Sequence, residues 1–361
     1  MSKWKIYRLG DILNFRRGHD LPKTNMVNGE IPVAGSNGII GYHNVSTPIE
    51  PCITIGRSGN VGTPYIYNKC WAHNTVLYVD NFKGNDPLYL YYLLKTIPLA
   101  SYGGGSAVPT LNRNHIHPIE IKHTPSLEEQ RRIAGILGAI DDKIENNRRI
   151  NDNLEQQAQA LFDKFFFENL QKERKELVNY AEINPTRTIT KNKEARCIEM
   201  ANLPTKGSFP NDWIFKPYSG GMKFQNGDTI MARITPCLEN GKTAYINFLD
   251  SNEIAFGSTE YIVLSAKEGF CPALFYFLAR NKEFVDYAVS HMNGSSGRQR
   301  VGGADIANFL MPHISLKDSA EFAKIAMPIM DVIKNNSLEN RKLSTLRDTL
   351  LPKLMSGELI L

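Results

Sequence analysis

Two glycine- and serine-rich loops carry side chains whose types suit recognition of DNA bases. In the second loop, Arg298-Gln299-Arg300 stands between Gly297 and Gly302-Gly303, and these glycines permit close approach of the backbone. Arginine can donate two hydrogen bonds to guanine, and glutamine or asparagine can pair with adenine. The corresponding loop of the first half covers residues 103–113. The candidate DNA-binding residues of the two loops are Ser106, Thr110, Asn112, Arg113, Ser296, Arg298, Gln299 and Arg300.

A second pair of segments follows a predicted strand in each half of the chain. These segments are Gly56-Arg57-Ser58-Gly59-Asn60 and Ala232-Arg233-Ile234-Thr235. Any one such segment could be no more than a solvated turn. Their occurrence at corresponding places in both halves favours a shared role in binding DNA. The candidates in these segments are Arg57, Ser58, Asn60, Arg233 and Thr235.

The signatures of common catalytic sites are incomplete. Gly241-Lys242-Thr243 has the end of a phosphate-binding loop, but Pro236 stands where that loop needs a glycine. Asn184-Pro185-Thr186-Arg187 is similar to an amino methyltransferase motif, except that arginine replaces the aromatic residue that stacks on a flipped base. Glu120-Ile121-Lys122 matches the end of many nuclease motifs, yet such triplets also occur by chance in surface strands. We therefore expect no catalytic site in this chain.

Three histidines that are close in sequence are the main candidates for metal ligands. His115, His117 and His123 would need a further ligand and a common face to bind a metal ion. His115 corresponds to Asp305 in the second half, so a duplicated metal site is improbable. We expect no metal ion in this chain.

Length and composition are those of an ordinary globular protein. The 361 residues can form two domains of about 130 residues plus helices. The net charge of +5 permits binding to a polyanion but suggests that a partner helps. We expect neither export nor a membrane span, because no run of 18 apolar residues occurs. The cysteines are odd in number and lack CxxC spacing, so we expect a cytoplasmic protein without a disulfide framework. They are Cys52, Cys70, Cys197, Cys237 and Cys271.

The elements that must position these loops are repeated along the chain. At a constant offset of 189 residues, Ile140–Asn147 matches Ile329–Asn336, with five identities in eight positions. This offset is far longer than the repeat of a solenoid, so a whole unit has been duplicated. Such a duplication predicts two related surfaces.

Each repeat ends in a predicted long helix with an apolar seam of 3.5-residue period. Two asparagines interrupt each seam, Asn147 and Asn151 in the first helix and Asn336 and Asn340 in the second. A buried asparagine specifies register, so we expect the helices to pair antiparallel, with Asn147 near Asn340 and Asn151 near Asn336. The alternative is that each helix packs only on its own domain. Pro328 predicts a break or kink near Met327 in the second helix.

The remaining sequence predicts mixed α+β domains. Short apolar runs separated by Gly-Asn and Asn-Gly turns predict strands at 52–56, 64–67, 75–79, 229–232, 243–246 and 260–264. Helices are expected at 87–94 and 272–278, and a short helix is expected within each of the segments 4–12 and 175–183. The expected organisation is a first domain at 1–124, a central helix at 125–168, a second domain at 169–313 and a distal helix at 314–361.

Taken together, these segments resemble the specificity subunit of type I restriction-modification systems over essentially the full chain. No single segment is specific, but the combination is. The segments that carry the resemblance are Leu9–Ile12, Gly105–Asn112, Leu127–Ala134, Gly257–Leu264 and Leu350–Leu359.

The resemblance implies a non-catalytic subunit with two α+β target-recognition domains. They would be related by pseudo-twofold symmetry and separated by two long antiparallel coiled-coil helices. Each domain would recognise one half of a bipartite double-stranded DNA target. The helices would fix the half-site spacing and dock two methyltransferase subunits, through charged residues such as Arg131, Arg132, Arg148 and Arg149. S-adenosylmethionine would be bound by those subunits, and ATP and Mg²⁺ by restriction and translocase subunits if these are present.

Two other functional classes remain open at this stage. A self-sufficient DNA-binding regulator would use the same loops without partners. A coiled-coil adaptor would use only the helices, leaving the arginines of the loops without a role. Copurification with a methyltransferase separates the first alternative from the favoured one, and substitution of Arg298 and Arg300 tests the second.

Overall fold

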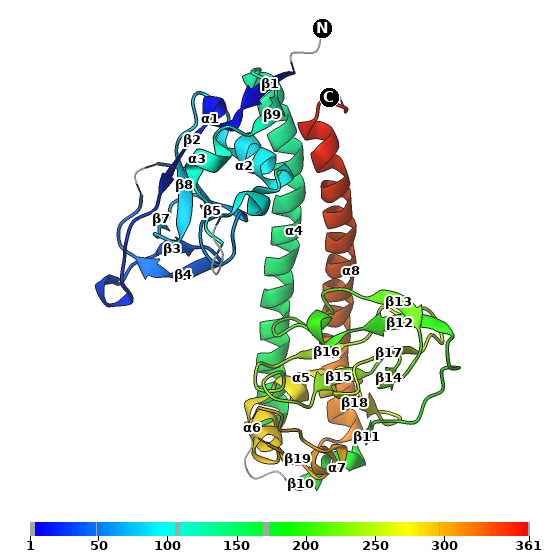
Figure 1. Ribbon diagram of the computed structural model, residues 1–361. Helices are drawn as coiled ribbons and strands as arrows, with labels where there is room; N and C mark the ends of the chain where they lie inside the picture. The colour runs from blue at the N-terminus through cyan, green and yellow to red at the C-terminus, as the bar shows by residue number, and fades with distance from the viewer. Residues whose placement is uncertain (1–3, 48, 105–108, 169–172, 296, 360–361) are drawn as a thin grey trace. The chain divides into compact units, whose positions relative to one another are not determined.

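The chain divides into two compact units in the computed structural model (Figure 1). Unit 1 comprises Met1–Ile144 and Lys342–Leu361, and unit 2 comprises Glu145–Arg341. Each unit combines a globular domain with segments of both long helices, whereas the expected domain boundaries follow the helix ends. The reason is packing, since helix residues such as Leu137 and Leu354 belong to the core of unit 1. The structure describes residues 4–47, 49–104, 109–168, 173–295 and 297–359.

Unit 1 is built around a four-stranded sheet with the order β2-β8-β5-β6, accompanied by the sheet β4-β3-β7 and the antiparallel pair β1-β9. The strands are β1 (Lys5–Arg8), β2 (Asn14–Arg17), β3 (Ile31–Gly35), β4 (Gly38–His43), β5 (Cys52–Gly56), β6 (Pro64–Tyr67), β7 (Trp71–Ala72), β8 (Val76–Asn81) and β9 (Glu120–His123). The helices are α1 (Leu9–Ile12), η1 (Lys23–Asn25), α2 (Pro87–Thr96), η2 (Leu99–Tyr102) and α3 (Arg113–Ile116).

The core of unit 1 explains why its strands are short and apolar. All five residues of β5 are buried, and β8 beside it is buried over its first four residues. Helix α2 covers this sheet with Tyr89, Leu90 and Leu93. It begins where expected, because Asp86 accepts a hydrogen bond from the backbone N–H of Tyr89 at 2.9 Å and Pro87 has the backbone angle of a first helical residue. The rigid sheet thereby positions the loop after β5.

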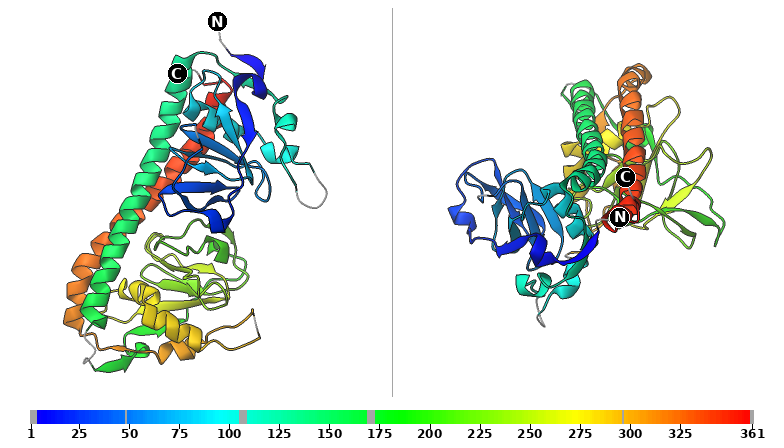
Figure 2. Two further views of the ribbon diagram at one scale, coloured as in Figure 1. Left: turned by 90° about the vertical axis from the view of Figure 1, so that its left-hand side faces the viewer. Right: turned by 90° about the horizontal axis from the view of Figure 1, so that it is seen from above.

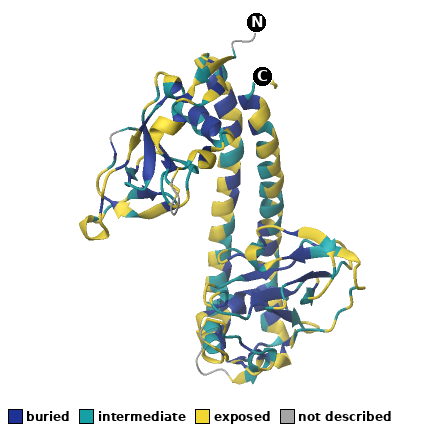
Figure 3. Ribbon diagram, in the orientation of Figure 1, coloured by how far each residue is buried: buried dark blue, intermediate teal, exposed yellow. Residues whose placement is uncertain are grey.

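Unit 2 has a four-stranded sheet with the order β11-β18-β15-β16, the same connectivity as β2-β8-β5-β6, and its strands β15, β16 and β18 are largely buried (Figure 3). A second sheet has the order β13-β12-β17-β14, and β10 pairs with β19. The strands are β10 (Arg174–Glu176), β11 (Ala181–Ile183), β12 (Glu194–Ile198), β13 (Ile214–Pro217), β14 (Lys223–Phe224), β15 (Thr229–Ala232), β16 (Thr243–Tyr245), β17 (Ala255–Gly257), β18 (Tyr261–Ala266) and β19 (Leu310–Pro312). The helices are η4 (Leu177–Asn179), η5 (Met200–Asn202), α5 (Leu274–Arg280), α6 (Lys282–Ser290) and α7 (Gly303–Ala307).

The strands and helices expected from the sequence are present in both units, and the α+β class is confirmed. The opening segments differ from expectation. Each begins with a strand, β1 or β10, before its short helical turn. The strands form because each finds an antiparallel partner just before a long helix, β9 or β19, and such distant pairing gives no local sequence signal.

The two long helices are α4 (Leu127–Phe162), followed by the π-helical turn η3 (Asp163–Phe167), and α8 (Leu316–Met355). The expected break near Met327 is wrong, because α8 continues through Pro328. Proline removes one backbone donor at a cost of about 3 kcal/mol. Pro328 is exposed, where water can solvate the carbonyl left without a partner, and the neighbouring Ala326 and Met330 are buried in the core.

Within unit 2, α4 and α8 run side by side in opposite directions (Figure 2). The Asn147 amide donates to Asn340 Oδ1 at 2.9 Å and is only 1 % exposed. The Asn336 amide donates to Asn151 Oδ1 at 2.8 Å. These are the two pairs that the antiparallel register predicts.

The same two helices also meet within unit 1. Arg347 of α8 donates to Asp141 Oδ1 of α4 at 2.7 Å. The other carboxylate oxygen of Asp141 accepts a hydrogen bond from the Tyr92 hydroxyl at 2.7 Å, which ties both helices to α2. Each helix therefore packs on its partner as well as on a domain, so the two modes of packing that the sequence left open occur together.

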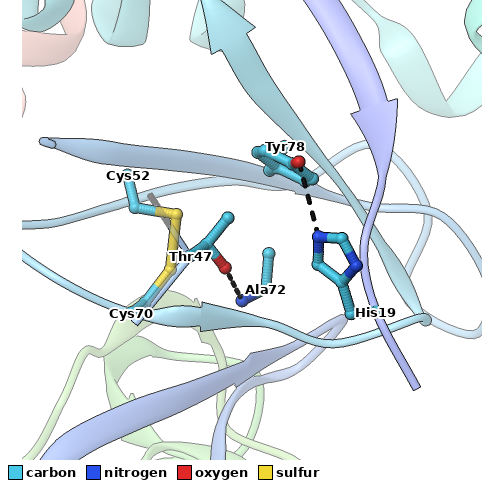
Figure 4. The surroundings of a disulfide bond; sticks show 6 residues. All are labelled: His19, Thr47, Cys52, Cys70, Ala72 and Tyr78. Carbon is cyan, nitrogen blue, oxygen red and sulfur yellow. Dashed lines mark hydrogen bonds between the residues drawn. A yellow bond between two sulfur atoms is a disulfide. The ribbon is translucent and has the colours of Figure 1, made fainter. Parts of the chain in front are cut away.

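A disulfide joins Cys52 and Cys70 in unit 1 (Figure 4), so the expectation of no disulfide is wrong for this pair. Cys52 begins β5 and Cys70 precedes β7, and their Cα atoms are 6.1 Å apart, within the range that a disulfide spans. The 18-residue separation gives no recognisable spacing in the sequence. Among the described residues, no helix is long and apolar enough to cross a membrane.

Candidate nucleic-acid interface

The backbone of unit 1 brings the two candidate segments of its domain together. The N–H of Leu111 donates to the carbonyl of Arg57 at 2.8 Å, and Ser58 and Thr110 form an isolated bridge. The N–H of Arg57 donates to the carbonyl of Thr75, at the start of β8, also at 2.8 Å. The loop after β5 is therefore held between the turn before β8 and the glycine-rich loop.

A cleft of about 420 Å³ lies at this junction. Its lining includes three of the predicted residues in addition to Arg57, and two arginines of β2 that the sequence analysis missed. The only signal for these two is a pair of adjacent basic residues at the end of a short strand. The lining residues are Arg16, Arg17, Arg57, Leu77, Thr110, Leu111, Asn112 and Arg113.

The charges of this cleft are largely uncompensated. Arg16 lies 3.5 Å from Asp80, but among the described residues no carboxylate lies within ion-pair distance of Arg17, Arg57 or Arg113. Burial lowers the pKa of the Arg57 guanidinium, and repulsion from Arg17 lowers it further. The cleft therefore concentrates positive charge and unused N–H donors.

Other predicted residues of unit 1 have structural partners. The Asn112 side chain caps α3 by accepting a hydrogen bond from the N–H of Asn114 at 3.0 Å. Asn60 accepts a hydrogen bond from the Thr63 hydroxyl at 3.3 Å. The amide donors of Asn112 are not needed for the cap. Ser106 lies outside the described residues.

Unit 2 repeats this backbone arrangement with different side chains. The N–H of Val301 donates to the carbonyl of Arg233 at 3.0 Å, and the N–H of Arg233 donates to the carbonyl of Glu260 at 3.0 Å. The N–H of Thr235 donates to the carbonyl of Gln299, also at 3.0 Å. Arg233 thus corresponds to Arg57 of unit 1. The structure brings the two predicted segments together in unit 2 as well.

An internal carboxylate engages the arginines of unit 2. Arg300 donates to Glu260 from Nε and Nη2 at 2.8–2.9 Å, and Arg233 Nε lies 3.6 Å from the same carboxylate. The hydrogen bonds from Arg300 lower the pKa of Glu260. Arg300, one of the three residues of the candidate segment Arg298-Gln299-Arg300, is therefore committed to an internal ion pair, whereas Arg298 is exposed. Ser296 lies outside the described residues.

Two residues of the methyltransferase-like motif, Asn184 and Arg187, have structural partners. Asn184 accepts a hydrogen bond from the N–H of Val263 at 2.9 Å, and Arg187 pairs with the buried Asp228. His123 is 2 % exposed, and burial lowers its pKa to about 4. Within the part of the chain that the structure describes, no group of three or more His, Cys, Asp or Glu residues could hold a metal ion.

Comparisons with known proteins agree with one another. Residues 1–156 match the family model of the type I restriction modification DNA specificity domain. The chain is 31% identical over 311 residues to the MjaIX specificity subunit of Methanocaldococcus jannaschii, covering 75% of this chain and 68% of that protein. It is 29% identical over 172 residues to the EcoAI specificity subunit of Escherichia coli, covering 45% of this chain and 29% of that subunit.

A solved structure has the same fold. The S subunit of the type I restriction-modification system from M. genitalium superposes with a TM-score of 0.68 at 15% identity, covering 98% of this chain and 96% of that one. At this identity the likeness shows the fold alone. The sequence match over two thirds of the M. jannaschii subunit is what shows the family. The chain belongs to the family of type I restriction enzyme specificity subunits.

Proposed function

We propose that this chain is the non-catalytic DNA-recognition subunit of a type I restriction-modification enzyme, and that each unit recognises one half of a bipartite target. The observation that carries the proposal is the repeated junction of two polar loops, held by the same backbone hydrogen bonds at Arg57 and at Arg233. Such a junction presents arginine, asparagine and glutamine side chains from a rigid sheet, which suits contacts with base edges and phosphates. Family membership supports the same assignment.

We propose further that α4 and α8 fix the spacing of the half-sites and dock two methyltransferase subunits. The pairing of Asn147 with Asn340 and of Asn151 with Asn336 supports a single helix register, as a spacer requires. Exposed side chains on the helices, such as Ile136 and Ile150, would be available to partners. S-adenosylmethionine would be bound by the methyltransferases, and ATP and Mg²⁺ by restriction or translocase subunits.

Copurification and methylation mapping test this proposal. Expression of the chain with the methyltransferase encoded by a neighbouring reading frame should yield a stable complex. Adenine methylation in the host genome should then fall in one bipartite motif that is absent when the chain is deleted. A chain that binds a specific site tightly without any partner would instead be a self-sufficient regulator. A chain whose deletion leaves all methylation in place would contradict the proposal.

The spacing role has a separate test. Insertion of seven residues at matching positions in both α4 and α8 keeps the seam in register and lengthens each helix by about 10 Å. The non-specific gap of the methylated motif should grow by about three base pairs at about 3.4 Å each, while both half-sites stay the same. A changed half-site sequence with an unchanged gap would contradict a spacer role.

A further inference from the structure

The cleft of unit 1 collects more positive charge than the protein itself balances. We call the group formed by Arg16, Arg17, Arg57 and Arg113 the arginine cleft. Arg16 and Arg17 come from β2, Arg57 from the loop after β5, and Arg113 from the start of α3. Among the described residues, Arg16 is the only one of the four with a carboxylate within ion-pair distance, which is that of Asp80 at 3.5 Å. Several guanidinium groups converge although their mutual repulsion disfavours this arrangement.

The hydrogen bonds that these arginines make within the described residues leave donors free for a ligand. Arg113 donates from Nη1 to the carbonyl of Phe15 at 3.3 Å, and Arg57 donates from Nη1 to the carbonyl of Asn74 at a marginal 3.5 Å. Each guanidinium has five N–H donors, so one such contact leaves most of them unused. The two contacts also hold the side chains in place. The cleft is therefore oriented for an acceptor with several oxygens.

In unit 2 a carboxylate of the protein itself lies at the place that corresponds to the arginine cleft. Arg57 and Arg233 have the same backbone partners, so Thr75 and Glu260 are equivalent positions. The Glu260 carboxylate pairs with Arg233 and Arg300. Thr75 carries no charge, and its hydroxyl lies 3.1 Å from Nδ1 of His73. Unit 1 thus keeps the arginine but has an uncharged threonine at the position where unit 2 has its carboxylate.

We infer that the arginine cleft of unit 1 binds a phosphate group of the DNA backbone, and that in unit 2 Glu260 takes the place of that phosphate. The inference rests on the proposed function, that the chain binds double-stranded DNA. As a consequence, the two units differ in how much they contribute to the affinity for DNA. Unit 1 provides salt-dependent affinity through this cleft, whereas Arg233 and Arg300 of unit 2, which are paired with Glu260, contribute little to it.

A phosphate fits this cleft better than a base edge. A base offers neutral acceptors, and one arginine suffices to bind guanine through two hydrogen bonds. Three arginines without carboxylate partners call for a full negative charge, and a phosphate accepts several charge-assisted hydrogen bonds at once. The Asn112 amide, whose oxygen alone caps α3, can add neutral donors. The anion that unit 2 places here is itself a full charge.

The salt dependence of DNA binding tests the inference. The full chain, with any copurified partners, is titrated with two duplexes of unrelated sequence between about 50 and about 200 mM salt. The variants Arg17→Gln, Arg57→Gln and Thr75→Glu should each make the plot of log affinity against log salt less steep, by about 0.9 for a lost phosphate contact. The loss of DNA affinity in each variant should be equal for both duplexes. An unchanged slope, or a loss confined to one sequence, overturns the inference.

Matched controls separate the cleft from general charge. Lys69→Gln removes an exposed cation of unit 1 that pairs with Glu50 at 3.3 Å, and the slope should stay the same. An equal loss in this variant overturns the assignment to the cleft. Glu260→Gln keeps the shape of the side chain but frees Arg233 and Arg300, so the slope should become steeper. An unchanged slope here overturns the role of Glu260.

Two further outcomes are distinguishable. Inorganic phosphate, measured by calorimetry, should bind to the unaltered chain and bind less well to Thr75→Glu. Phosphate could bind while the variants leave the salt dependence of DNA affinity unchanged. The cleft would then be a site for small anions, and the inference would fail while the proposed function stands. If the unaltered chain and its partners bind no duplex at any salt concentration, both the inference and the proposed function fail.

Discussion

The two units have the same connectivity but balance their charges in opposite ways. The sheets β2-β8-β5-β6 and β11-β18-β15-β16 hold their loops through equivalent backbone hydrogen bonds. Among the described residues of unit 1, no carboxylate lies within ion-pair distance of Arg57, whereas unit 2 pairs Arg233 and Arg300 with Glu260. Backbone hydrogen bonds are indifferent to the side chains of the residues that make them. A duplicated frame can therefore keep its geometry while its binding surface changes.

The contacts that α4 and α8 make at equivalent positions also differ between the two units. Unit 1 joins α4 and α8 by the ion pair of Asp141 and Arg347. The positions 189 residues away are Met330 and Ala158, which are both buried in the core of unit 2. Unit 2 also has a cluster of phenylalanines around Phe322. At these equivalent positions the helices are therefore polar in unit 1 and apolar in unit 2, where the polar helix contacts lie instead at the paired asparagines.

The largest expected effect concerns this phenylalanine cluster. Phe322 is fully buried and its ring contacts those of Phe162, Phe166 and Phe277. Phe322→Ala should lower the free energy of unfolding of unit 2 by about 3–5 kcal/mol. Urea unfolding measures the loss, and hydrogen exchange should locate it in unit 2. Val332→Ala, at an exposed position of the same helix, is the control and should change stability little.

The second effect is acid sensitivity confined to unit 1. His123 is buried between the rings of Tyr7 and Tyr89, and burial lowers its pKa from 6.5 to about 4. The unfolded chain binds the proton more readily, so stability is full above pH 6.5 and falls as the pH drops towards 4. The loss should be on the order of 3 kcal/mol. Unfolding of unit 1 as a function of pH checks this, and equal pH dependence in His123→Gln would refute the assignment.

The third effect tests the polar helix contact. A double-mutant cycle with Arg347→Met and Asp141→Asn should give a coupling energy of about 1 kcal/mol that decreases with added salt. The carboxylate also accepts the hydrogen bond from Tyr92, so Asp141→Asn alone should cost more than Arg347→Met alone. A coupling of zero at low salt would mean that the pair does not stabilise unit 1.

The smallest effect is the pH dependence of the loops in unit 2. The hydrogen bonds from Arg300 lower the folded pKa of Glu260 below 4.5, so their contribution is present above that pH and is lost as the pH falls through the folded value. Hydrogen exchange of residues 297–301 should therefore accelerate in acid in the unaltered chain. The difference in exchange rate between the unaltered chain and Glu260→Gln should vanish at low pH. A difference that persists in acid would exclude the ion pair as its cause.

Much of the fold was predictable because its signals are local or periodic. The 3.5-residue seam predicted both long helices, and the four asparagines predicted how they pair. Pro328 wrongly predicted a break in the helix. Helix propensity describes an isolated helix, whereas α8 is held in place by Ala326 and Met330, which are buried in a core. Cys52 and Cys70 gave no signal, because they come together only when the chain segments of two different sheets pack against each other.

The candidate interface was predictable in part. The loops at Arg57 and Arg298 follow from their composition and their duplication. Arg16 and Arg17 were missed, because a basic pair at the end of a strand shows no partner until β2 lies beside β8. The ion pair of Arg300 was not predictable, because its partner Glu260 is 40 residues away in sequence.

By itself the sequence determined the duplication, the α+β class, the paired helices and the family resemblance, since all of these depend on spacing and residue type along the chain. Only the tertiary structure decided which arginines are free and which are neutralised. An ion pair depends on distances of a few ångströms between residues far apart in sequence, and those distances exist only once the sheets have formed. Thr75 and Glu260 occupy equivalent places in the two units, and only the second of these residues supplies a carboxylate to the neighbouring arginine.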